Sequence, residues 1–190
     1  SSGYLSEVTG FVKTKVNTLT GAIEFPSVTG NARIKGININ YIEGAPKISN
    51  VHGTAALSLD QVTFKIHRGE SRGVAIDKGS VVLSKIGSGN QVAAVDLFLL
   101  GSIKNKLELI KKLQIGHSKR FSVTPQSFLG KAVSRLRLEL PLISGIKRDD
   151  IQLRIESSMN DASILGIASG KDIKDGNFLV KINLDRLELA

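Results

Sequence analysis

The stretch AVSRLRLEL, residues 132–140, carries the pattern that decides the fold of this chain. Leu136, Leu138 and Leu140 alternate with charged residues, so an extended strand here is apolar on one side and polar on the other. The same alternation returns over 151–156 and 180–185. Strands of this kind are typical of an antiparallel sheet with one solvated face.

The first half of the chain follows the same rule. Alternating runs over 55–59 and 62–66 are separated from later strands by turn sequences at 68–71, 77–79 and 86–90. Strands that recur roughly every 8–12 residues indicate consecutive hairpins. We therefore predict a mainly β protein, with an antiparallel meander sheet curled into a groove or open sandwich and one or two short helices.

Residues 92–100 differ from the other strands, because both of their faces are largely apolar. The segment 103–113 that follows has apolar residues at helical spacing among Lys, Asn and Glu. We predict a short amphipathic helix there, covering the second face of 92–100. A second short helix is predicted over 125–130.

The chain divides into two parts that differ in how clearly apolar and polar residues alternate. Residues 1–30 carry weaker strand signals, at 11–16 and 18–25, whereas 31–190 form a clear β-rich segment. A strand over 32–42 is expected to contain a bulge near Gly36-Ile37, where the alternation slips. We expect the β-rich segment to be an excerpt of a longer protein.

Composition excludes several kinds of site. The chain has 190 residues and no Cys, which rules out disulfides and thiolate metal sites. No His or carboxylate motif with metal-ligand spacing is present, and no glycine-rich phosphate loop. We expect no metal and no cofactor.

One tract fits a catalytic motif. Gly69-Glu70-Ser71-Arg72-Gly73 matches the nucleophile elbow G-x-S-x-G, which requires a strand-to-helix turn. Here it lies between two alternating strands, which predicts a hairpin instead. We therefore expect no enzyme, with the alternative that Ser71 acts with one of the three histidines.

The formal net charge of +9 favours anionic partners. The densest basic region is 104–120, and it nominates these residues for contact with anionic headgroups: Lys104, Lys106, Lys111, Lys112, Lys119 and Arg120. The alternative is the solvated face of a helix. A nucleic-acid module usually adds stacking aromatics, and Phe121 is the only one nearby, so no nucleic acid is expected.

The order of these features resembles a known family. The resemblance rests on four stretches: 39–59, 62–82 with its hairpin glycines, 94–113, and 130–176 with Leu138-Glu139-Leu140-Pro141-Leu142. They are similar to the periplasmic β-rich region, a domain of unknown function, of AsmA-like envelope proteins of the YhdP branch. The resemblance covers most of residues 30–190.

The resemblance implies a bridge-like lipid carrier. Such proteins are anchored in the inner membrane of Gram-negative bacteria, and a β-groove carries phospholipid acyl chains through the periplasm toward the outer membrane. The implied partners are phospholipid, neighbouring segments of the same long chain, and the membrane through an anchor elsewhere in the parent protein. Envelope lipid homeostasis and outer-membrane biogenesis are the implied roles.

The apolar side of the strands is the candidate lipid-contacting surface. Its predicted members are Leu57, Leu59, Val62, Phe64, Ile66, Val74, Ile76, Val95, Leu97, Leu99, Leu136, Leu138, Leu140, Ile151, Leu153, Ile155, Val180 and Ile182. The alternative is a structural or protein-interaction module, whose sheet edges pair with neighbouring repeats or a partner chain. A closed core, in which a second sheet covers the same side chains, would favour this alternative. Alternation is identical in both cases.

Overall fold

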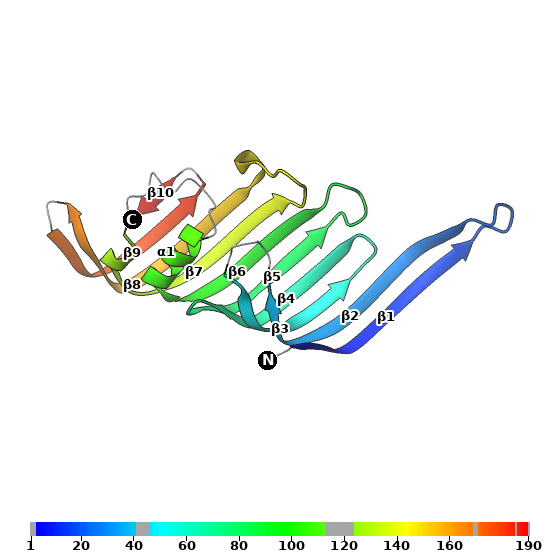
Figure 1. Cartoon of the computed structure of the whole chain (residues 1–190), viewed down its shortest axis with the longest axis horizontal. Coiled ribbons are helices and arrows are strands. Elements are labelled where there is room, and N and C mark those ends of the chain that lie inside the picture. The colour runs from blue at the N-terminus through cyan, green and yellow to red at the C-terminus, as the bar shows by residue number, and fades with distance from the viewer. Residues whose placement is uncertain (1–2, 41–45, 113–123, 169–170, 185, 190) are drawn as a thin grey trace.

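The computed structural model describes residues 3–40, 46–112, 124–168, 171–184 and 186–189. They form one ten-stranded antiparallel sheet, in which the strands stand in chain order and do not close into a barrel (Figure 1). The predicted meander is confirmed. The strands are β1 Tyr4–Val16, β2 Ile23–Ile39, β3 Ile48–Leu57, β4 Gln61–Ser71, β5 Val74–Ser84, β6 Val92–Ser102, β7 Phe128–Pro141, β8 Gln152–Ala168, β9 Lys171–Asn183 and β10 Leu187–Leu189.

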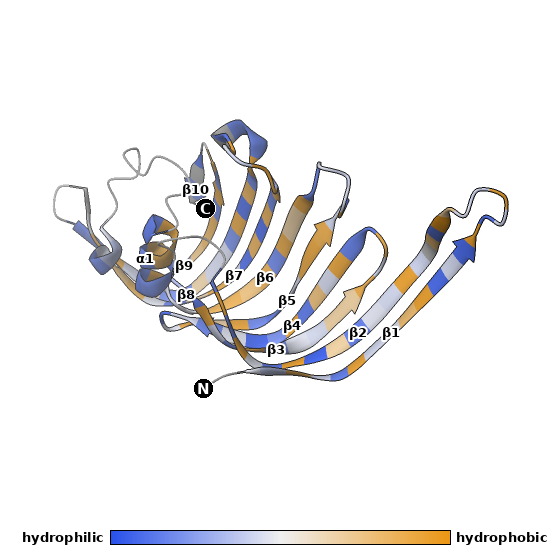
Figure 2. Cartoon of the chain, turned by 45° about the vertical axis from the view of Figure 1, so that its right-hand side comes forward, coloured by the Kyte–Doolittle hydropathy of each residue, from blue (hydrophilic) through white to orange (hydrophobic). Residues whose placement is uncertain are grey.

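The alternation of the sequence becomes two faces of one curved sheet. Directly paired residues on neighbouring strands point to the same side. Val81, Val95 and Leu138 stand in one such row, which continues to Phe64 on β4 and Leu153 on β8. Figure 2 shows the resulting stripes of apolar residues along the strands. The side on which these residues lie is the concave face, and the opposite side is the convex face.

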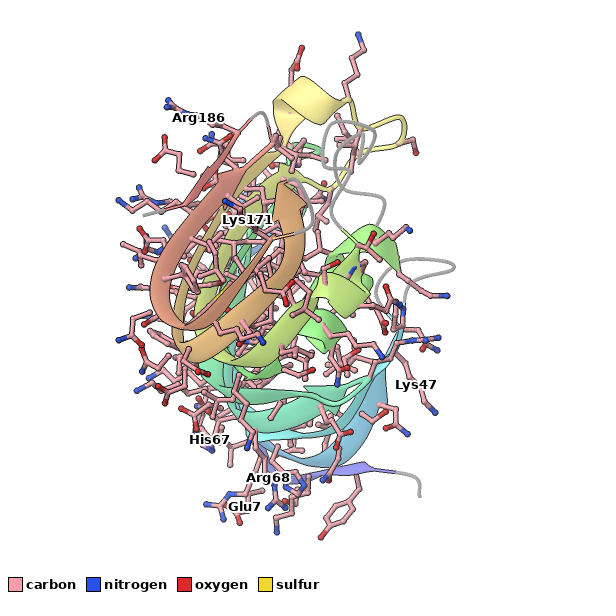
Figure 3. The ribbon with its side chains drawn as sticks, turned by 90° about the vertical axis from the view of Figure 1, so that its left-hand side faces the viewer. Glu7, Lys47, His67, Arg68, Lys171 and Arg186 are labelled. Atoms are coloured by element: carbon pink, nitrogen blue, oxygen red, sulfur yellow. The ribbon has the colours of Figure 1, made fainter. Side chains whose placement is uncertain are left out.

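Bulges interrupt the pairing at several points and bend the strands. The predicted bulge at Gly36-Ile37 is confirmed, because the β2–β3 register shifts between Ile34 and Ile37 and Gly36 has φ +65°. Further shifts occur in β1–β2, β3–β4, β5–β6, β7–β8 and β8–β9. The curvature of the sheet is visible when it is viewed from its end (Figure 3).

The N-terminal strands belong to the same sheet, although the predicted strand over 18–25 begins too early. Residues 18–20 form a turn, and β2 starts at Ile23. The Asn17 side chain explains this, because its Oδ1 accepts the backbone N–H groups of Leu19 and Thr20 at 3.0 and 3.2 Å. A side chain that bonds the backbone locally stabilises a turn at the expense of a strand.

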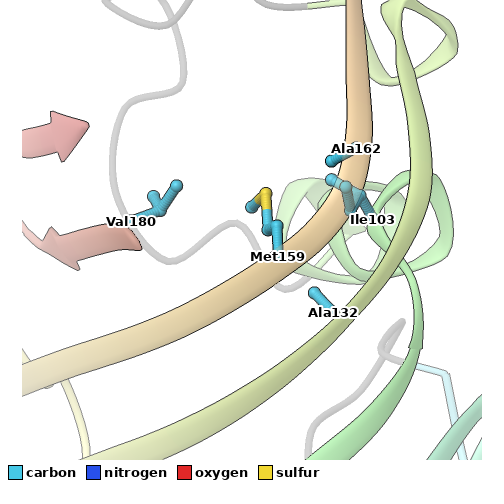
Figure 4. Close-up of a cluster of buried hydrophobic side chains, with 5 residues drawn as sticks. All are labelled: Ile103, Ala132, Met159, Ala162 and Val180. Atoms are coloured by element: carbon cyan, nitrogen blue, oxygen red, sulfur yellow. The ribbon is translucent and has the colours of Figure 1, made fainter. Parts of the chain in front are cut away.

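The helix α1, Ile103–Lys112, forms where the sequence predicts it. Its expected position is wrong: α1 lies on the concave face, opposite to the convex second face of β6 that it was expected to cover. Ile103 is buried against a cluster of Ala132, Met159, Ala162 and Val180 (Figure 4). Of these, Ala132 and Met159 are paired in a row that reaches Gly101 on β6.

The chain turns onto the concave face at the end of β6. Gly101 has φ +156°, close to the extended range, and Ser102 accepts the backbone N–H of Asn105 through its Oγ at 3.1 Å. A serine that accepts from the residue three positions on begins a helix. The predicted second helix over 125–130 is shorter than expected. It is a single 3₁₀ turn, η2 Pro125–Ser127, and β7 starts at Phe128; a similar turn, η3 Arg148–Asp150, precedes β8.

Candidate functional site: the concave apolar face

The concave face collects the predicted lipid-contacting residues. All of them except Leu59 and Ile151 lie on strands and share this face through the pairing rows. Leu59 lies in the β3–β4 turn and is 54% exposed, and Ile151 directly precedes β8. The period-2 pattern therefore assigns the face correctly wherever a regular strand exists, and fails in a turn, where alternation has no geometric meaning.

The concave face has a buried floor. Val51, Ile66, Ile76 and Leu97 are 1–6% exposed and pack together as one cluster. They are covered by partly exposed neighbours on the same side, which include Val81, Val95, Leu99 and Leu136. The floor is therefore ordinary protein core, and the half-exposed residues form the surface that a ligand could touch.

No second sheet covers this face within the described residues. All ten strands belong to one sheet, and α1 packs only at the end of the face that Ala132 and Met159 occupy. Val62, Phe64, Val95 and Leu138 remain half-buried in a single layer. Contiguous apolar surfaces are found at protein, membrane and ligand interaction sites, so this face is the candidate functional site.

Two glycines shape the floor. Gly53 and Gly79 occupy the same row as Ile66 and Leu97, so small and large residues alternate across β3 to β6. A Cβ atom on Gly53 would collide with the backbone carbonyl oxygen of Lys65, so no other residue fits here without a shift of the backbone. The missing side chains make room for the isoleucine and the leucine beside them.

Sequence reasoning missed several members of the concave face. Val51, Val81 and Leu83 share it with the predicted residues, as do Ile34 and Met159. The signal for Val81 and Leu83 was available, because they alternate with Val82 and Ser84 in the predicted strand. Val51 was hidden, because the alternation around it shifts at the bulge between Ser49 and His52.

A polar centre interrupts the apolar rows beneath α1. Ser134 and Ser157 stand where neighbouring strands carry Leu99 and Val180, and their hydroxyl groups lie 2.7 Å apart. The Lys106 ammonium donates to Ser134 Oγ at 2.9 Å, to the Leu99 carbonyl at 2.9 Å and to the carbonyl of Ala132. All three donors of the lysine are therefore used inside the protein.

Lys106 thus differs from the other predicted headgroup contacts. It is 8% exposed, and burial lowers the pKa of its amine to about 8. No carboxylate pairs with it among the described residues. Lys104, Lys111 and Lys112 are exposed on α1, whereas Lys119 and Arg120 lie outside the described residues.

The convex face of β6, β7 and β8 carries an ion-pair network. Arg135 donates to both carboxylate oxygens of Asp96 at 2.9 and 2.6 Å, and this hydrogen bonding lowers the pKa of Asp96. Arg137 approaches Asp96 and Glu156 at 3.9 Å. The Phe98 ring is flanked by Lys78 and Arg135, 5.2 and 5.1 Å from its centroid. Long cationic side chains therefore cover the aromatic residue that α1 was expected to cover.

The G-x-S-x-G tract forms the predicted hairpin. Arg72 and Gly73 connect β4 to β5 with φ of +49° and +72°, and Ser71 pairs with Val74. The Ser71 hydroxyl is buried and donates to the Lys47 carbonyl at 3.0 Å. His52 lies beside Asn50 and Arg68 instead, and its pKa is lowered by desolvation and by the cations Arg68 and Lys35.

The side chains labelled in Figure 3 are all polar or charged, and His67, Arg68 and Glu7 point away from the sheet at its lower edge.

The described residues contain no group of three His, Asp or Glu side chains that could hold a metal ion. Within the same part of the chain, no helix has the length and apolar character needed to cross a bilayer.

Comparisons with known proteins add no relative. No family model, no curated protein and no solved structure matches this chain. The concave face, with its buried floor, its half-exposed aliphatic surface and the polar centre under α1, is therefore the feature from which a function must be argued.

Proposed function

We propose that this chain is a segment of an AsmA-like lipid-transfer protein of the Gram-negative periplasm, whose concave face carries phospholipid acyl chains between the inner and outer membranes. The main observation in support of this proposal is the aliphatic surface of the sheet, which no second sheet covers within the described residues. Each CH₂ group of an acyl chain that moves from water onto such a surface gains about 0.8 kcal/mol.

The chemistry of the surface suits an alkyl chain. Its half-exposed members are Val, Leu and Ile with one Phe, and they offer no hydrogen-bonding groups along most of the rows. An acyl chain binds through apolar contact area and a matching shape of the surface, and it forms no hydrogen bonds. The exposed lysines of α1, Lys104, Lys111 and Lys112, stand on a helix that packs on the same face and supply positive charge for a phosphate headgroup.

The test is lipid retention after purification from bacterial cells, measured by native mass spectrometry. Leu138 is the residue to change, because it is half-buried and outside the buried floor, so a charged substitution leaves the core intact. Leu138→Glu should reduce retained phospholipid at least about tenfold, since one buried carboxylate costs several kcal/mol.

Gln152→Glu is the matched control. Gln152 is exposed on the convex face of β8, so this variant adds the same carboxylate to the opposite side of the sheet. It should retain phospholipid like the unmodified protein. Absence of lipid from the unmodified protein, or equal retention by Leu138→Glu, would contradict the proposal, and far-UV circular dichroism verifies that each variant is folded.

A further inference from the structure

Three basic side chains meet on the convex face of β2, β3 and β4. Ile34 pairs with Gly53 on the concave side, so the next position of this antiparallel register sets Lys35 opposite His52 on the convex side. His52 pairs in turn with Arg68 of β4, whose side chain points away from the sheet (Figure 3). We call these three residues, Lys35, His52 and Arg68, the cationic row.

The cationic row has no carboxylate partner in the described part of the chain. On the same convex face, Arg33 and Arg135 each lie near a carboxylate oxygen, at 3.0 and 2.6 Å. Neither Lys35 nor Arg68 forms such an ion pair with a described residue. Two fixed positive charges therefore stand on either side of His52, and both are available to an anion.

The hydrogen bonds around His52 conflict with one another. Its Nε2 atom lies 3.0 Å from Arg68 Nη2, which can only donate, and 2.8 Å from Asn50 Oδ1, which can only accept. An unprotonated Nε2 satisfies the arginine alone, and a protonated Nε2 satisfies the asparagine alone. Exchange of the Asn50 oxygen and nitrogen would leave two donors on one lone pair. A further acceptor for Arg68 removes the conflict.

We infer that the cationic row binds a phosphate group, carried by a soluble phosphate ester or by a lipid headgroup. A phosphate monoester has a charge of about −1.5 to −2 near neutral pH, which matches the two fixed cations, whereas a carboxylate neutralises only one of them. Its oxygens accept from Arg68 and Lys35. The Nε2–H of His52 is then free to donate to Asn50.

The charge state of His52 supports this assignment. Desolvation lowers the pKa of His52, and the neighbouring charges of Arg68 and Lys35 lower it further. A bound anion offsets both of these charges and favours the protonated ring, so it raises the same pKa. Binding of phosphate and protonation of His52 are therefore coupled.

A polar hollow adjoins the cationic row on the convex face. Its volume is about 310 Å³, and its lining includes Arg33, Thr54 and Lys65 of the next row and Asn31 beyond them. Thr54 follows His52 by two residues, which places it on the same side of β3 and about 7 Å along the strand. The hollow therefore offers space and hydrogen-bonding groups to the polar part of a phosphate ester.

Titration of the full chain with inorganic phosphate tests the inference, with the ring protons of His52 followed by NMR at constant ionic strength. The resonances should move to saturation with a dissociation constant below about 5 mM at pH 7.5. Sodium chloride at the same ionic strength should not saturate them. His52→Gln assigns the resonances by removing them.

The pKa of His52 supplies a second readout. It is measured in sodium chloride and in sodium sulfate, because sulfate is a tetrahedral dianion that does not itself titrate in this range. The pKa of His52 should be higher in sulfate by about one unit. An equal pKa in the two salts would contradict binding beside His52.

Charge removal tests the two fixed cations. Arg68→Gln and Lys35→Gln should each raise the dissociation constant for phosphate at least about fivefold, because each removes one charged donor. The matched controls are Arg72→Gln in the β4–β5 turn and Lys131→Gln on β7, which remove the same charges elsewhere. Both controls should stay within about twofold of the unmodified chain.

Sedimentation with phosphatidylcholine vesicles, with and without phosphatidic acid, distinguishes the two sources of phosphate. Binding to phosphatidic acid that Arg68→Gln weakens supports the site and assigns it to a lipid headgroup. Saturable binding of inorganic phosphate without such vesicle binding supports the site and assigns it to a soluble ester.

No saturable response to phosphate, or a dissociation constant that Arg68→Gln and Lys35→Gln leave unchanged, would overturn the inference. The outcome is independent of the proposed lipid transfer, since the cationic row lies on the opposite face of the sheet. Leu138→Glu, on the concave face, should therefore leave the dissociation constant for phosphate unchanged.

Discussion

Gly79 on β5 stands directly opposite Leu97 on β6, and a Cβ atom on residue 79 would lie 2.6 Å from Leu97 Cδ2. The leucine therefore lies over the glycine, in the space that a side chain would otherwise fill. On the other side of Gly79 stands Ile66 of β4. The buried floor of the concave face is close-packed because the large side chains of Ile66 and Leu97 fill the space left by the missing side chain of Gly79.

Replacing Gly79 should be costly. Gly79→Ala is expected to lower the free energy of unfolding by about 2 kcal/mol, because the new methyl group meets the backbone and side chain of Leu97 in a packed cluster. Urea unfolding followed by circular dichroism measures the change. Gly69→Ala is the control, because its nearest neighbours are side-chain atoms 3.4 Å away; an equal loss in both variants would contradict the explanation.

The stability of the protein should depend on pH through Lys106. Its folded-state pKa of about 8 lies below the ordinary value of 10.5, so between these two values the unfolded chain holds a proton that the folded chain has released. The free energy of unfolding should therefore rise as pH increases from about 8 to about 10.5. The expected rise is about 1–3 kcal/mol.

Lys106→Met isolates that contribution. The variant cannot titrate at this position, so its stability should change less than that of the unmodified protein over the same pH range. Chemical unfolding at pH 7.5, 9 and 10.5 makes the comparison, with Lys104→Met as a control on the exposed side of α1. Parallel pH curves for the unmodified protein and Lys106→Met would show that the buried amine does not titrate in this way.

Asp96 should contribute stability that is lost in acid. The hydrogen bonds from Arg135 lower its folded-state pKa below 3.8, so the contribution is present above the unfolded value and disappears as pH falls through the folded value. Asp96→Asn is expected to cost about 0.5–1.5 kcal/mol at pH 7, a modest figure because both partners are about a third exposed.

The acid dependence distinguishes this ion pair from simple packing. The difference between the unmodified protein and Asp96→Asn should shrink toward zero as pH is lowered from 5 to about 2. Asp60→Asn, in the β3–β4 turn, serves as the comparison. A difference that stays constant over this range would mean that the carboxylate charge is not the cause.

The β4–β5 turn can be improved. Arg72 has φ +49°, a conformation that asparagine adopts more readily than arginine. Arg72→Asn should raise the melting temperature by about 1–3 °C in differential scanning calorimetry. Gly73→Ala should lower it, because Gly73 has φ +72° and a Cβ atom there would lie 2.6 Å from Asn105 Nδ2. A lower melting temperature for Arg72→Asn would refute this reading of the turn.

The local part of the fold was predictable from the sequence. Alternation has a period of two residues, so it assigns Leu136, Leu138 and Leu140 to one face without knowledge of their partners. The slip near Gly36 likewise indicated a bulge. Whether that face was closed by a second sheet could not be predicted, because a sandwich and an open sheet require the same alternation.

The position of α1 could not be predicted for a related reason. Both faces of β6 are apolar, and the choice between them depends on the turn at Gly101 and on the contact of Ile103 with strands that come later in the chain. Lys106 offered an overlooked signal. It lies three residues after Ile103 and one before Leu107, on the apolar stripe of the helix, where a lysine is placed for burial.

The strict chain order of the strands has a consequence for how the protein comes apart. Each strand pairs only with the strands before and after it in the sequence, so the energy of the sheet is close to a sum of nearest-neighbour terms. A substitution that weakens the pairing of two strands should then destabilise only those strands and the adjacent hairpins. The exposed β1–β2 hairpin should exchange its amide hydrogens by opening separately at low free energy, while β6–β8, beneath α1, should exchange their amide hydrogens most slowly.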